Sequence, residues 1–489
     1  MRADGIEPTR PAWKAGVLPL NYAREAQAGS FAGVAFRSSC NHTQKTRAPT
    51  AGILFGRSVS TASVFELAPR GRPVTPAEVR DLVARACPAD EFRGRRVLLI
   101  IPDGTRTAPI GLMFKALFTA LAGVARQLDV MIALGTHPPM SDDEINARVE
   151  ITLEERVTTY REVGFINHEW NNPGELRDVG HIPADEIRAL SGGLFTMDVP
   201  VRINRRVFDY DRLIIVGPVF PHEVVGFSGG NKYLFPGIGG PEVLHFFHWL
   251  GAVVTNPMII GNKWTAVRKV VDRAAALVPV PTLCFCLVVR DHDELAGLFA
   301  GSPTVAWDRA SDLSAEVHIT HKERAFQLVL SCAPEMYEEL WVAGKSMYKL
   351  EPVVADGGEI IVYAPHVRTI SHAHGEVIER VGYHCRDYFL KQWDRFKHEP
   401  WGVLAHLTHL YGVGRYNEKT RTETPRIRVT LATGLSEATC RKLNLGYRDW
   451  RTIEPAAFAH REAEGVLLVE RAGERLYQLR TKPKWAGGE

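Results

Sequence analysis

The segment RLIIVGPVFPHEVVGFSGGNKYLFPG, residues 212–237, decides the fold of this chain. Its first part, Arg212–Gly217, is a short apolar run with the composition of a buried strand. The remainder is rich in glycine and carries His222 and Lys232. In open α/β sheets, ligands bind beyond the carboxyl ends of strands, and glycine-rich turns present backbone N–H groups to anions. The segment therefore predicts an α/β fold with a ligand site at the end of this strand.

Further apolar runs of the same kind lie on both sides of this segment. Arg96–Ile101 and Asp129–Leu134 precede it, with a helical pattern over 110–128 between them. Strand, helix and strand at this spacing are typical of parallel sheets. A second set of β-rich segments follows the proline-containing joint at 278–281, and it comprises residues 282–289, 328–330, 359–363, 426–432 and 466–469. We therefore predict two α/β lobes with mainly parallel sheets and the active site in the cleft between them.

The predicted domain boundaries follow from these runs. Residues 1–74 lack sustained periodicity and are basic, so we predict a poorly ordered N-terminal extension, with a targeting segment as the alternative. A helix with proline in its first turn opens at Pro76. The N-terminal α/β domain, which would bind the ligand, is predicted over 75–279. The C-terminal α/β domain is predicted over 280–489.

Composition and charge narrow the class of protein. The 489 residues suffice for two or more domains, and the net charge of +3 is spread along the chain, so no nucleic-acid partner is expected. No window approaches the roughly 18 consecutive apolar residues of a membrane helix. The seven cysteines are scattered without a CxxC pair, and Cys284 and Cys286 are expected on one face of a buried strand. We therefore predict a cytoplasmic protein with no membrane partner.

Reactive side chains follow three of the predicted strands. Asp103-Gly104-Thr105-Arg106 follows the first, and Gly135-Thr136-His137 follows the second. The third is followed by His222 and Lys232, with His248 sixteen residues beyond the lysine. Parallel strands would bring these loops to one edge of the sheet. Two histidines, an arginine and a lysine in one crevice suit acid–base chemistry on an anionic substrate.

Each of these motifs also has a purely structural explanation. The 103–106 loop could be a turn cap with a surface ion pair, and His137 could stack beneath the prolines that follow it. Ser141–Glu144 has the pattern of a capping box, which we predict to be structural. His245 and His248 lie in an apolar helical segment, where a histidine packs more often than it binds a ligand. It is the joint occurrence of these groups at neighbouring strand ends that favours a catalytic site.

These segments resemble the nickel-pincer lactate racemases and their 2-hydroxyacid racemase and epimerase relatives. The resemblance covers about residues 75–480 and is most specific over 212–248. The family's spacing of histidine, lysine and histidine is kept across His222, Lys232 and His248. The other matching pieces are Asp103–Arg106, Gly135–His137, Gly226–Gly237, and Lys345 ahead of the Gly-Gly strand at 357–361.

The resemblance implies a role for each matching residue. Lys232 would hold a Ni(II)-pyridinium-3,5-bisthiocarboxylic acid mononucleotide covalently, and His248 would be the one protein ligand to nickel. His137 and His222 would be the two acid–base residues. The loop that meets cofactor and substrate would be formed by Asp103, Gly104, Thr105 and Arg106. The substrate carboxylate would be held by Arg106 and Lys345.

The resemblance breaks at the substrate site. Lactate racemases carry tyrosine and glutamine four and three residues before the substrate lysine, whereas this chain has Trp341 and Val342. Loss of the amide removes a polar contact and the indole adds bulk, so we expect lactate to be a poor substrate. A tryptophan packed near the cofactor would be Trp401, with Trp393 as the alternative. The tract 371–375, Ser-His-Ala-His-Gly, either lines the pocket or forms a solvated loop, and we favour the loop.

The implied reaction is inversion of the carbinol carbon of a 2-hydroxy acid by hydride transfer to the cofactor. One histidine would take the hydroxyl proton, and hydride return to the other face would invert the centre. Cofactor-synthesis proteins would then be required partners. Two alternatives come from other classes. One is a zinc-dependent hydrolase using His137, His222 and His248, and the other is a non-catalytic nucleotide-binding protein or cofactor carrier.

Overall fold

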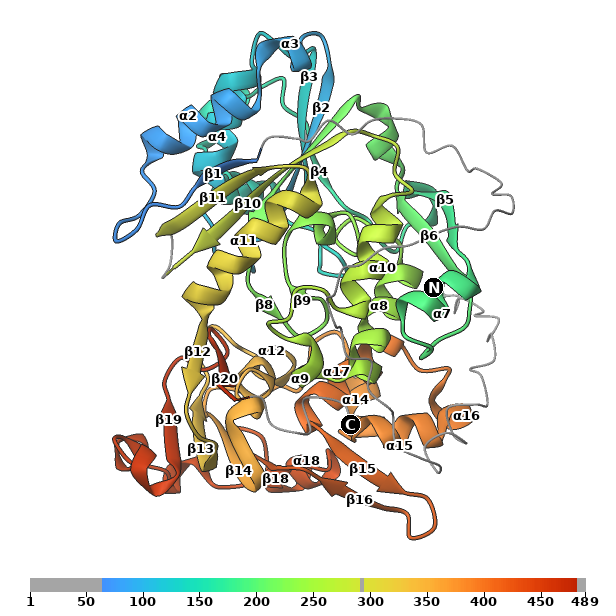
Figure 1. Cartoon of the computed structure of the whole chain (residues 1–489), viewed down its shortest axis with the longest axis vertical. Coiled ribbons are helices and arrows are strands. Elements are labelled where there is room, and N and C mark those ends of the chain that lie inside the picture. Colours follow the sequence, from blue (N-terminus) through green and yellow to red (C-terminus); the bar gives the residue numbers. More distant parts are fainter. Residues whose placement is uncertain (1–63, 291–293, 482–489) are drawn as a thin grey trace, which may run out of the picture.

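Two sheets organise the chain, in a computed structural model that describes residues 64–290 and 294–481. A seven-stranded sheet lies toward the upper end of the view in Figure 1, and a five-stranded sheet lies toward the lower end. Most of the predicted extension, residues 1–74, lies outside the described residues. Its last part is not an extension, because strand β1 (Phe65–Leu67) pairs with β11 (Leu295–Gly301).

The larger sheet contains the strands predicted at 96–101, 129–134 and 212–217. Its order is β1-β11-β10-β7-β2-β3-β4, with neighbours parallel from β10 to β4 and antiparallel at β1 and β11. The strands not yet defined are β2 (Arg96–Pro102), β3 (Gln127–Ala133), β4 (Phe165–Asn167), β7 (Arg212–Pro218) and β10 (Thr282–Val289). The fold is therefore mixed α/β with mainly parallel pairing, as predicted.

Burial on both faces explains the uninterrupted apolar runs of these strands. In β2, Leu98 and Ile100 pack in the same core cluster as helices α8 (Pro241–Val254) and α10 (Ala266–Ala275). Val97 and Leu99 point the other way, toward α2 (Pro76–Ala86) and α4 (Ile110–Leu121). A strand covered by helices on both sides has no polar face, so its sequence does not alternate.

Two details of the predicted elements were wrong. The segment Thr282–Val289, which we assigned to the C-terminal lobe, is β10 of the larger sheet and pairs in parallel with β7. Its apolar run signals a buried strand but carries no information about which sheet receives it. The crossover helix predicted over 110–128 ends at Leu121, because Gly123, with φ at 75°, turns the chain. Cys284 and Cys286 do lie buried on one face, with sulfurs 3.5 Å apart.

The smaller sheet is parallel throughout, in the order β18-β17-β14-β13-β19. It confirms the other four strands predicted for the C-terminal part. Its strands are β13 (Phe326–Cys332), β14 (Val354–Ala364), β17 (Arg428–Thr433), β18 (Gly446–Tyr447) and β19 (Val466–Val469). Between β14 and β17 the chain forms helices α14 (Gly375–Val381), α15 (Arg386–Lys391), α16 (Trp393–Phe396) and α17 (Trp401–Tyr411).

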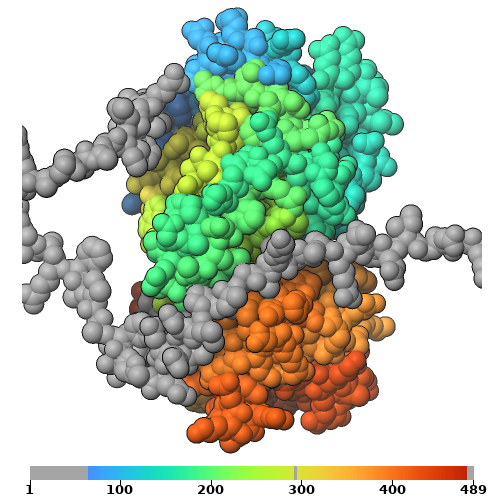
Figure 2. All heavy atoms as spheres, turned by 90° about the vertical axis from the view of Figure 1, so that its right-hand side faces the viewer, coloured from blue at the N-terminus to red at the C-terminus, as the bar shows by residue number. Residues whose placement is uncertain are grey.

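The two parts of the molecule meet through helices. Helix α11 (Pro303–His318) leads from the larger sheet to β12 (Ile319–Lys322), which pairs with β20 (Leu476–Leu479) near the chain's end. Helices α8 and α17 lie against each other in the region between the sheets (Figure 1). The space-filling view of Figure 2 shows the residues of the larger sheet above and those of the smaller sheet, in orange and red, below. No helix within 64–290 and 294–481 is long and apolar enough to cross a bilayer.

Candidate active site

The loops that follow β2, β3 and β7 meet, as the parallel pairing of these strands requires. The Nδ1 atom of His137, after β3, lies 2.5 Å from Oδ2 of Asp103, after β2. The Gly135 N–H donates to the carbonyl of Gly237, in the glycine-rich turn after β7, at 2.9 Å. The structure therefore brings together three loops that lie far apart in the sequence.

The Asp103 carboxylate fixes the orientation and tautomer of His137. Asp103 is buried and also accepts hydrogen bonds from Thr105, at 2.6 Å from its hydroxyl and 3.2 Å from its N–H. Burial alone would raise the pKa of Asp103, but the hydrogen bonds and the charges of His137 and Arg106 outweigh it and lower the pKa to about 2. An ionised carboxylate only accepts, so Nδ1 of His137 carries the proton. The lone pair then lies on Nε2, on a ring that is 49% exposed.

His222 has the opposite arrangement. It lies in β8 (Pro221–His222), opposite Gly226 of β9 (Gly226–Phe227), and is buried. Burial lowers the pKa of His222 well below its ordinary value, so the ring is neutral. Its Nδ1 accepts the Val224 N–H at 3.1 Å, which places the ring proton on Nε2. Glu223 Oε2 lies 3.4 Å from the same Nδ1. One ring nitrogen cannot both accept from Val224 and donate to Glu223, and the shorter, aligned contact with Val224 decides.

Lys232 lies in the tight turn that follows this hairpin. The turn η3 (Gly230–Tyr233) comes directly after Gly229, where φ is 85°. Burial, then the positive charges of Arg106 and Arg268, lower the pKa of Lys232 to about 7, against opposing effects of Glu223 and Asp103. At neutral pH a large fraction of this amine is therefore unprotonated and nucleophilic.

Two histidines of α8 differ in which ring nitrogen is engaged. His248 donates from Nδ1 to the carbonyl of Leu244 at 2.7 Å, so its Nε2 carries the lone pair. His245 accepts the Gly402 N–H of α17 on Nδ1, at 3.3 Å. Burial lowers the pKa of both rings to about 4, so both are neutral. Of these two rings, His248 is the one whose Nε2 carries the lone pair while Nδ1 is held by a backbone carbonyl, an arrangement common among metal-binding histidines.

The C-terminal part adds buried cations to the site. Lys345 opens helix α13 (Lys345–Tyr348), and Lys349 follows one turn later on the same face. Burial and Arg106 lower the pKa of Lys345 to about 8, and burial does the same for Lys349. Glu223 interacts electrostatically with both. Lys349 was missed in the sequence, where only its four-residue spacing from Lys345 pointed to it.

Aromatic rings cover the segment just before Lys345. Trp341, in α12 (Leu340–Ala343), stacks on His406 of α17 with ring centroids 3.9 Å apart, and His374 lies 4.6 Å from the indole. The 371–375 tract is thus not simply solvated: it is a loop whose buried Ser371 accepts the His374 N–H at 3.2 Å and whose His374 packs on Trp341. Sequence reasoning also missed His406, because a histidine in an apolar helix resembles core packing.

The two candidate tryptophans form one aromatic group with α8. Trp393 stacks on Trp249 at 5.3 Å, and Trp401 contacts Trp393 edge-on at 5.4 Å. Trp401 also donates from Nε1 to the carbonyl of Lys397 at 3.1 Å. Neither arrangement selects one of the two as the tryptophan that packs near the cofactor.

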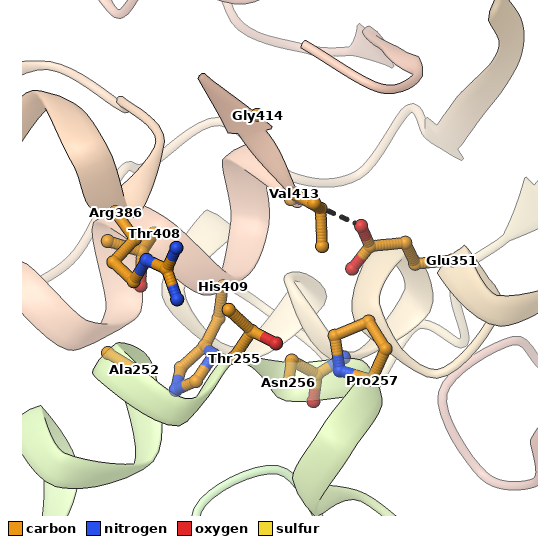
Figure 3. A pocket seen from close by; sticks show the side chains of 11 residues that line it. Ala252, Thr255, Asn256, Pro257, Glu351, Arg386, Thr408, His409, Val413 and Gly414 are labelled. Carbon is orange, nitrogen blue, oxygen red and sulfur yellow. Dashed lines mark hydrogen bonds between the residues drawn. The ribbon is translucent and has the colours of Figure 1, made fainter. Parts of the chain in front are cut away.

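A small pocket lies beside this site, at the carboxyl ends of α8 and α17 (Figure 3). Its volume is about 30 Å³, enough for one or two water molecules. Buried side-chain atoms without a hydrogen-bond partner in the described part of the chain line it: Asn256 Oδ1, Glu351 Oε2 and His409 Nε2. Glu351 accepts the Val413 N–H with its other oxygen (Figure 3). None of the predicted site residues lines this pocket.

The arrangement of possible metal ligands distinguishes the zinc-hydrolase hypothesis from the nickel-pincer hypothesis. Within 64–290 and 294–481, no three or more His, Cys, Asp or Glu side chains gather closely enough to hold a metal ion. The three-histidine zinc site of the hydrolase alternative, with His137, His222 and His248, is therefore not formed. A metal held by a single protein ligand and by a covalently attached group needs no such cluster. The bare Nε2 of His248 and the unprotonated amine of Lys232 fit a group of that kind.

The chain is similar to lactate racemases in sequence. A family model described as the lactate racemase N-terminal domain matches residues 86–258. The lactate racemase of Lactiplantibacillus plantarum is 27% identical over 280 residues, 56% of this chain and 61% of that protein. The lactate racemase of Thermoanaerobacterium thermosaccharolyticum is 22% identical over 277 residues, 55% of this chain and 60% of that protein. The match thus spans about 60% of the length of these relatives.

Solved structures share the fold over more of the chain. A Thermotoga maritima protein from a structural-genomics programme superposes with a TM-score of 0.75 at 30% identity, covering 85% of this chain and 100% of that one. The lactate racemase apoprotein of T. thermosaccharolyticum gives a TM-score of 0.62 at 18% identity, covering 82% of this chain and 93% of that one. The mixed α/β architecture is therefore common to all three.

Proposed function

The chain is a member of the lactate racemase-like family, and on that premise we propose that it is an isomerase that inverts the carbinol carbon of a 2-hydroxy acid. One observation carries the proposal. His137 and His222, both at strand ends, are held in opposite tautomers beside Lys232 and the buried cations. Such a pair can take a proton at one position and give one at another.

Lys232 and His248 would hold a nickel-pincer nucleotide. When bound, this group supplies the hydride acceptor that the unactivated carbinol C–H requires. With a pKa of about 7, about half of the Lys232 amines are unprotonated at pH 7, compared with roughly one in three thousand for an ordinary lysine. The hydrogen bond from His248 Nδ1 to the Leu244 carbonyl orients the ring, and Nε2 would be the one protein ligand to nickel.

The two catalytic histidines would play complementary parts in each turnover. His137, with Asp103 at its Nδ1–H, presents the lone pair of Nε2 and is the base that takes the hydroxyl proton. Asp103 stabilises the imidazolium that results, because its carboxylate stays ionised. His222 presents Nε2–H and would give that proton to the oxygen of the planar keto acid as the hydride returns. A proton from solvent would then restore His222, and the half-exposed His137 would release the proton that it took, so that the protons balance over one turnover. The exchange of roles in the opposite direction makes the reaction reversible.

Arg106 and Lys345 would bind the substrate carboxylate and keep the keto acid in place. Both form no ion pair with a carboxylate in the part of the chain that the structure describes. Arg106 acts electrostatically on His222, Lys232 and Lys345, so its charge lies at the centre of the group. Positive charges that form no direct ion pair with a protein carboxylate favour an anionic ligand. Holding it in one orientation brings the carbinol carbon to the reacting groups.

Trp341 would determine which substrate side chains the site accepts. Its indole stacks on His406 and contacts His374. The side of the proposed substrate site next to Trp341 is therefore apolar and bulky. The adjacent Val342 offers no amide to a small polar substrate. We propose that the preferred substrate has a larger or less polar side chain than lactate. Cytoplasmic location and a need for cofactor-synthesis proteins belong to the same proposal.

The function is tested with holoenzyme made alongside cofactor-synthesis proteins. Each pure enantiomer from a panel of 2-hydroxy acids is incubated with it, and chiral chromatography follows appearance of the other enantiomer. Interconversion of at least one acid, lost in the His137→Ala protein, is expected. No interconversion of any acid by protein that carries the adduct would contradict the proposal.

A further inference from the structure

Two side chains hold the three residues that lead into the Lys232 turn. Arg268, on α10, donates from Nη2 to the Phe227 carbonyl at 2.5 Å and from Nη1 to the Gly229 carbonyl at 3.3 Å. Trp307, on α11, donates from Nε1 to the carbonyl between them, that of Ser228, at 2.9 Å. All three successive carbonyls are therefore satisfied by side chains from two different helices.

Arg268 and Trp307 also fix each other. The guanidinium carbon lies 3.9 Å from the centroid of the indole ring, a close cation–π contact between two side chains that are each only 1% exposed. A rigid planar guanidinium on a rigid ring has little freedom, so the positions of its donors are well defined. The pair therefore holds the backbone carbonyls of residues 227–229 in defined positions.

Neighbouring side chains pack closely against the backbone of the turn. A Cβ atom on Gly229 would lie 2.7 Å from the Val219 side chain, and one on Gly230 would lie 3.0 Å from Cβ of Trp307. One helical turn beyond Arg268, Asp272 accepts a hydrogen bond from Nδ2 of Asn231 at 2.9 Å. Every residue from 227 to 231 thus contacts α10 or α11, and Lys232 is the next in the chain.

Stabilisation of the fold does not by itself explain why a buried arginine occupies position 268. Among the residues described, no carboxylate forms an ion pair with its guanidinium, and its Nε has no hydrogen-bond partner. Carbonyl oxygens, the Trp307 ring and the more distant charge of Asp272 answer its charge, and burying an arginine without a direct ion pair is costly compared with an apolar side chain of similar volume. Its charge also faces Lys232, where burial, Arg106 and Arg268 act together and Glu223 and Asp103 oppose them.

We propose that Arg268 and Trp307 are positioning residues for Lys232, which hold the glycine-rich turn so that the amine points in one direction before the cofactor is attached. The inference rests on the proposed function only for the identity of the group that Lys232 receives. Neither residue touches that group in this account, because both act through the backbone of 227–229.

The experiment compares Arg268→Met with a matched control elsewhere in the fold. Arg426 is similarly buried and donates to the carbonyls of Val354 and Glu351 at 2.8 and 2.7 Å, but it lies in the C-terminal part. It differs from Arg268 in also forming ion pairs, with Asp356 at 3.1 Å and Glu351 at 3.7 Å. Arg426→Met should therefore lower thermal stability as Arg268→Met does, without touching the turn. Trp307→Phe keeps an aromatic ring beneath Arg268 but removes the Nε1 donor and the five-membered part of the indole. If Arg268→Met does not fold, Trp307→Phe replaces it in the comparison.

Hydrogen exchange on the full-length apoprotein is the first readout. The amides of Leu234 and Phe235, which donate to the Asn231 carbonyl, should exchange at least tenfold faster in Arg268→Met and about threefold faster in Trp307→Phe, an estimate for loss of one modest hydrogen bond. They should not change in Arg426→Met. Unchanged exchange in a folded Arg268→Met protein would overturn the inference.

The second readout is the fraction of Lys232 that carries a mass adduct in protein made with cofactor-synthesis proteins. We expect at least a fivefold lower fraction in Arg268→Met and less than a twofold change in Arg426→Met. Equal loss in both variants would assign Arg268 a purely structural role. Absence of any adduct in the unaltered protein would instead refute the proposed function, while the exchange experiment would still test the positioning.

Discussion

The two sides of the candidate site are built differently. On the N-terminal side, His137, His222 and Lys232 all lie at strand ends. The Asp103 carboxylate fixes His137, the Val224 N–H fixes His222, and Lys232 lies in the tight turn η3. On the C-terminal side, Lys345 and Trp341 come from two short helices, α12 and α13, and contact mainly other side chains. The first side defines proton positions, whereas the second supplies charge and shape. Variants on the first side should therefore abolish turnover, and those on the second should change which acid is used.

The largest effect is expected for the two histidines of the N-terminal side. His137→Ala and His222→Ala should each lower racemisation by about a thousandfold or more in both directions, because each turnover needs one base and one acid. Keto-acid formation from one enantiomer should survive in His222→Ala, which keeps the base. Chiral chromatography and a keto-acid assay on holoenzyme measure both. A loss of less than tenfold in either variant would break the distinction between the two sides.

Removing the metal ligand should come next. His248→Ala should lower nickel occupancy at least tenfold, because Nε2 of His248 is the single protein donor in the proposal. His245→Ala is the control on the same helix, since its Nδ1 is engaged by the Gly402 N–H. Metal analysis of purified holoenzyme measures the occupancy. The reverse order would mean that the wrong histidine of α8 has been assigned.

Asp103 should contribute a pH-dependent stability. Its folded pKa, about 2, lies below the ordinary value of 3.8, so the stabilisation is complete above about pH 4 and is lost as the pH falls toward 2. The shift corresponds to about 2 kcal/mol at neutral pH. Asp103→Asn should cost about that much at pH 7 and little near pH 2, as measured by urea unfolding. A cost that does not change with pH would show that hydrogen-bond geometry, not charge, is what Asp103 contributes.

The smallest effect concerns the C-terminal side. A bulkier 2-hydroxy acid should be preferred over lactate by about tenfold, an estimate from the roughly 1–3 kcal/mol cost of a mispaired polar group. Trp341→Tyr should narrow this preference while changing the turnover of the best substrate less than the histidine variants do. Steady-state kinetics on a substrate panel measure the ratio. Lactate as the best substrate would refute the specificity and leave the catalytic assignment standing.

The sequence predicted the N-terminal side of the site because strands that are buried on both faces have uninterrupted apolar runs. The apolar runs at 96–101 and 212–217 became β2 and β7, and the polar loops after them could only lie at one edge. The capping box Ser141–Glu144 was also confirmed at the start of helix α5 (Asp142–Arg148). These features are local, so a short window of residues contains all the information.

What the sequence did not reveal depends on contacts between distant segments. The apolar run of β10 is the same whichever sheet it joins, and its pairing with β7 is decided by tertiary packing. His406 and His409 lie in an apolar helix and look like core residues in isolation. Arg268 appears in the sequence as one more charged residue of α10, and its three hydrogen bonds to the carbonyls of Phe227 and Gly229 arise only when that helix packs on the glycine-rich turn.

The central claim is that Lys232 receives a covalent nickel-containing group, and the mass of one peptide tests it most directly. Protein made with cofactor-synthesis proteins is digested, and the peptide that contains Lys232 is measured beside the same peptide from Lys232→Ala protein. We predict an added mass on Lys232 alone, together with nickel in the intact protein, and loss of both in the variant. An unmodified Lys232 in protein that contains nickel and racemises its substrate would contradict the account.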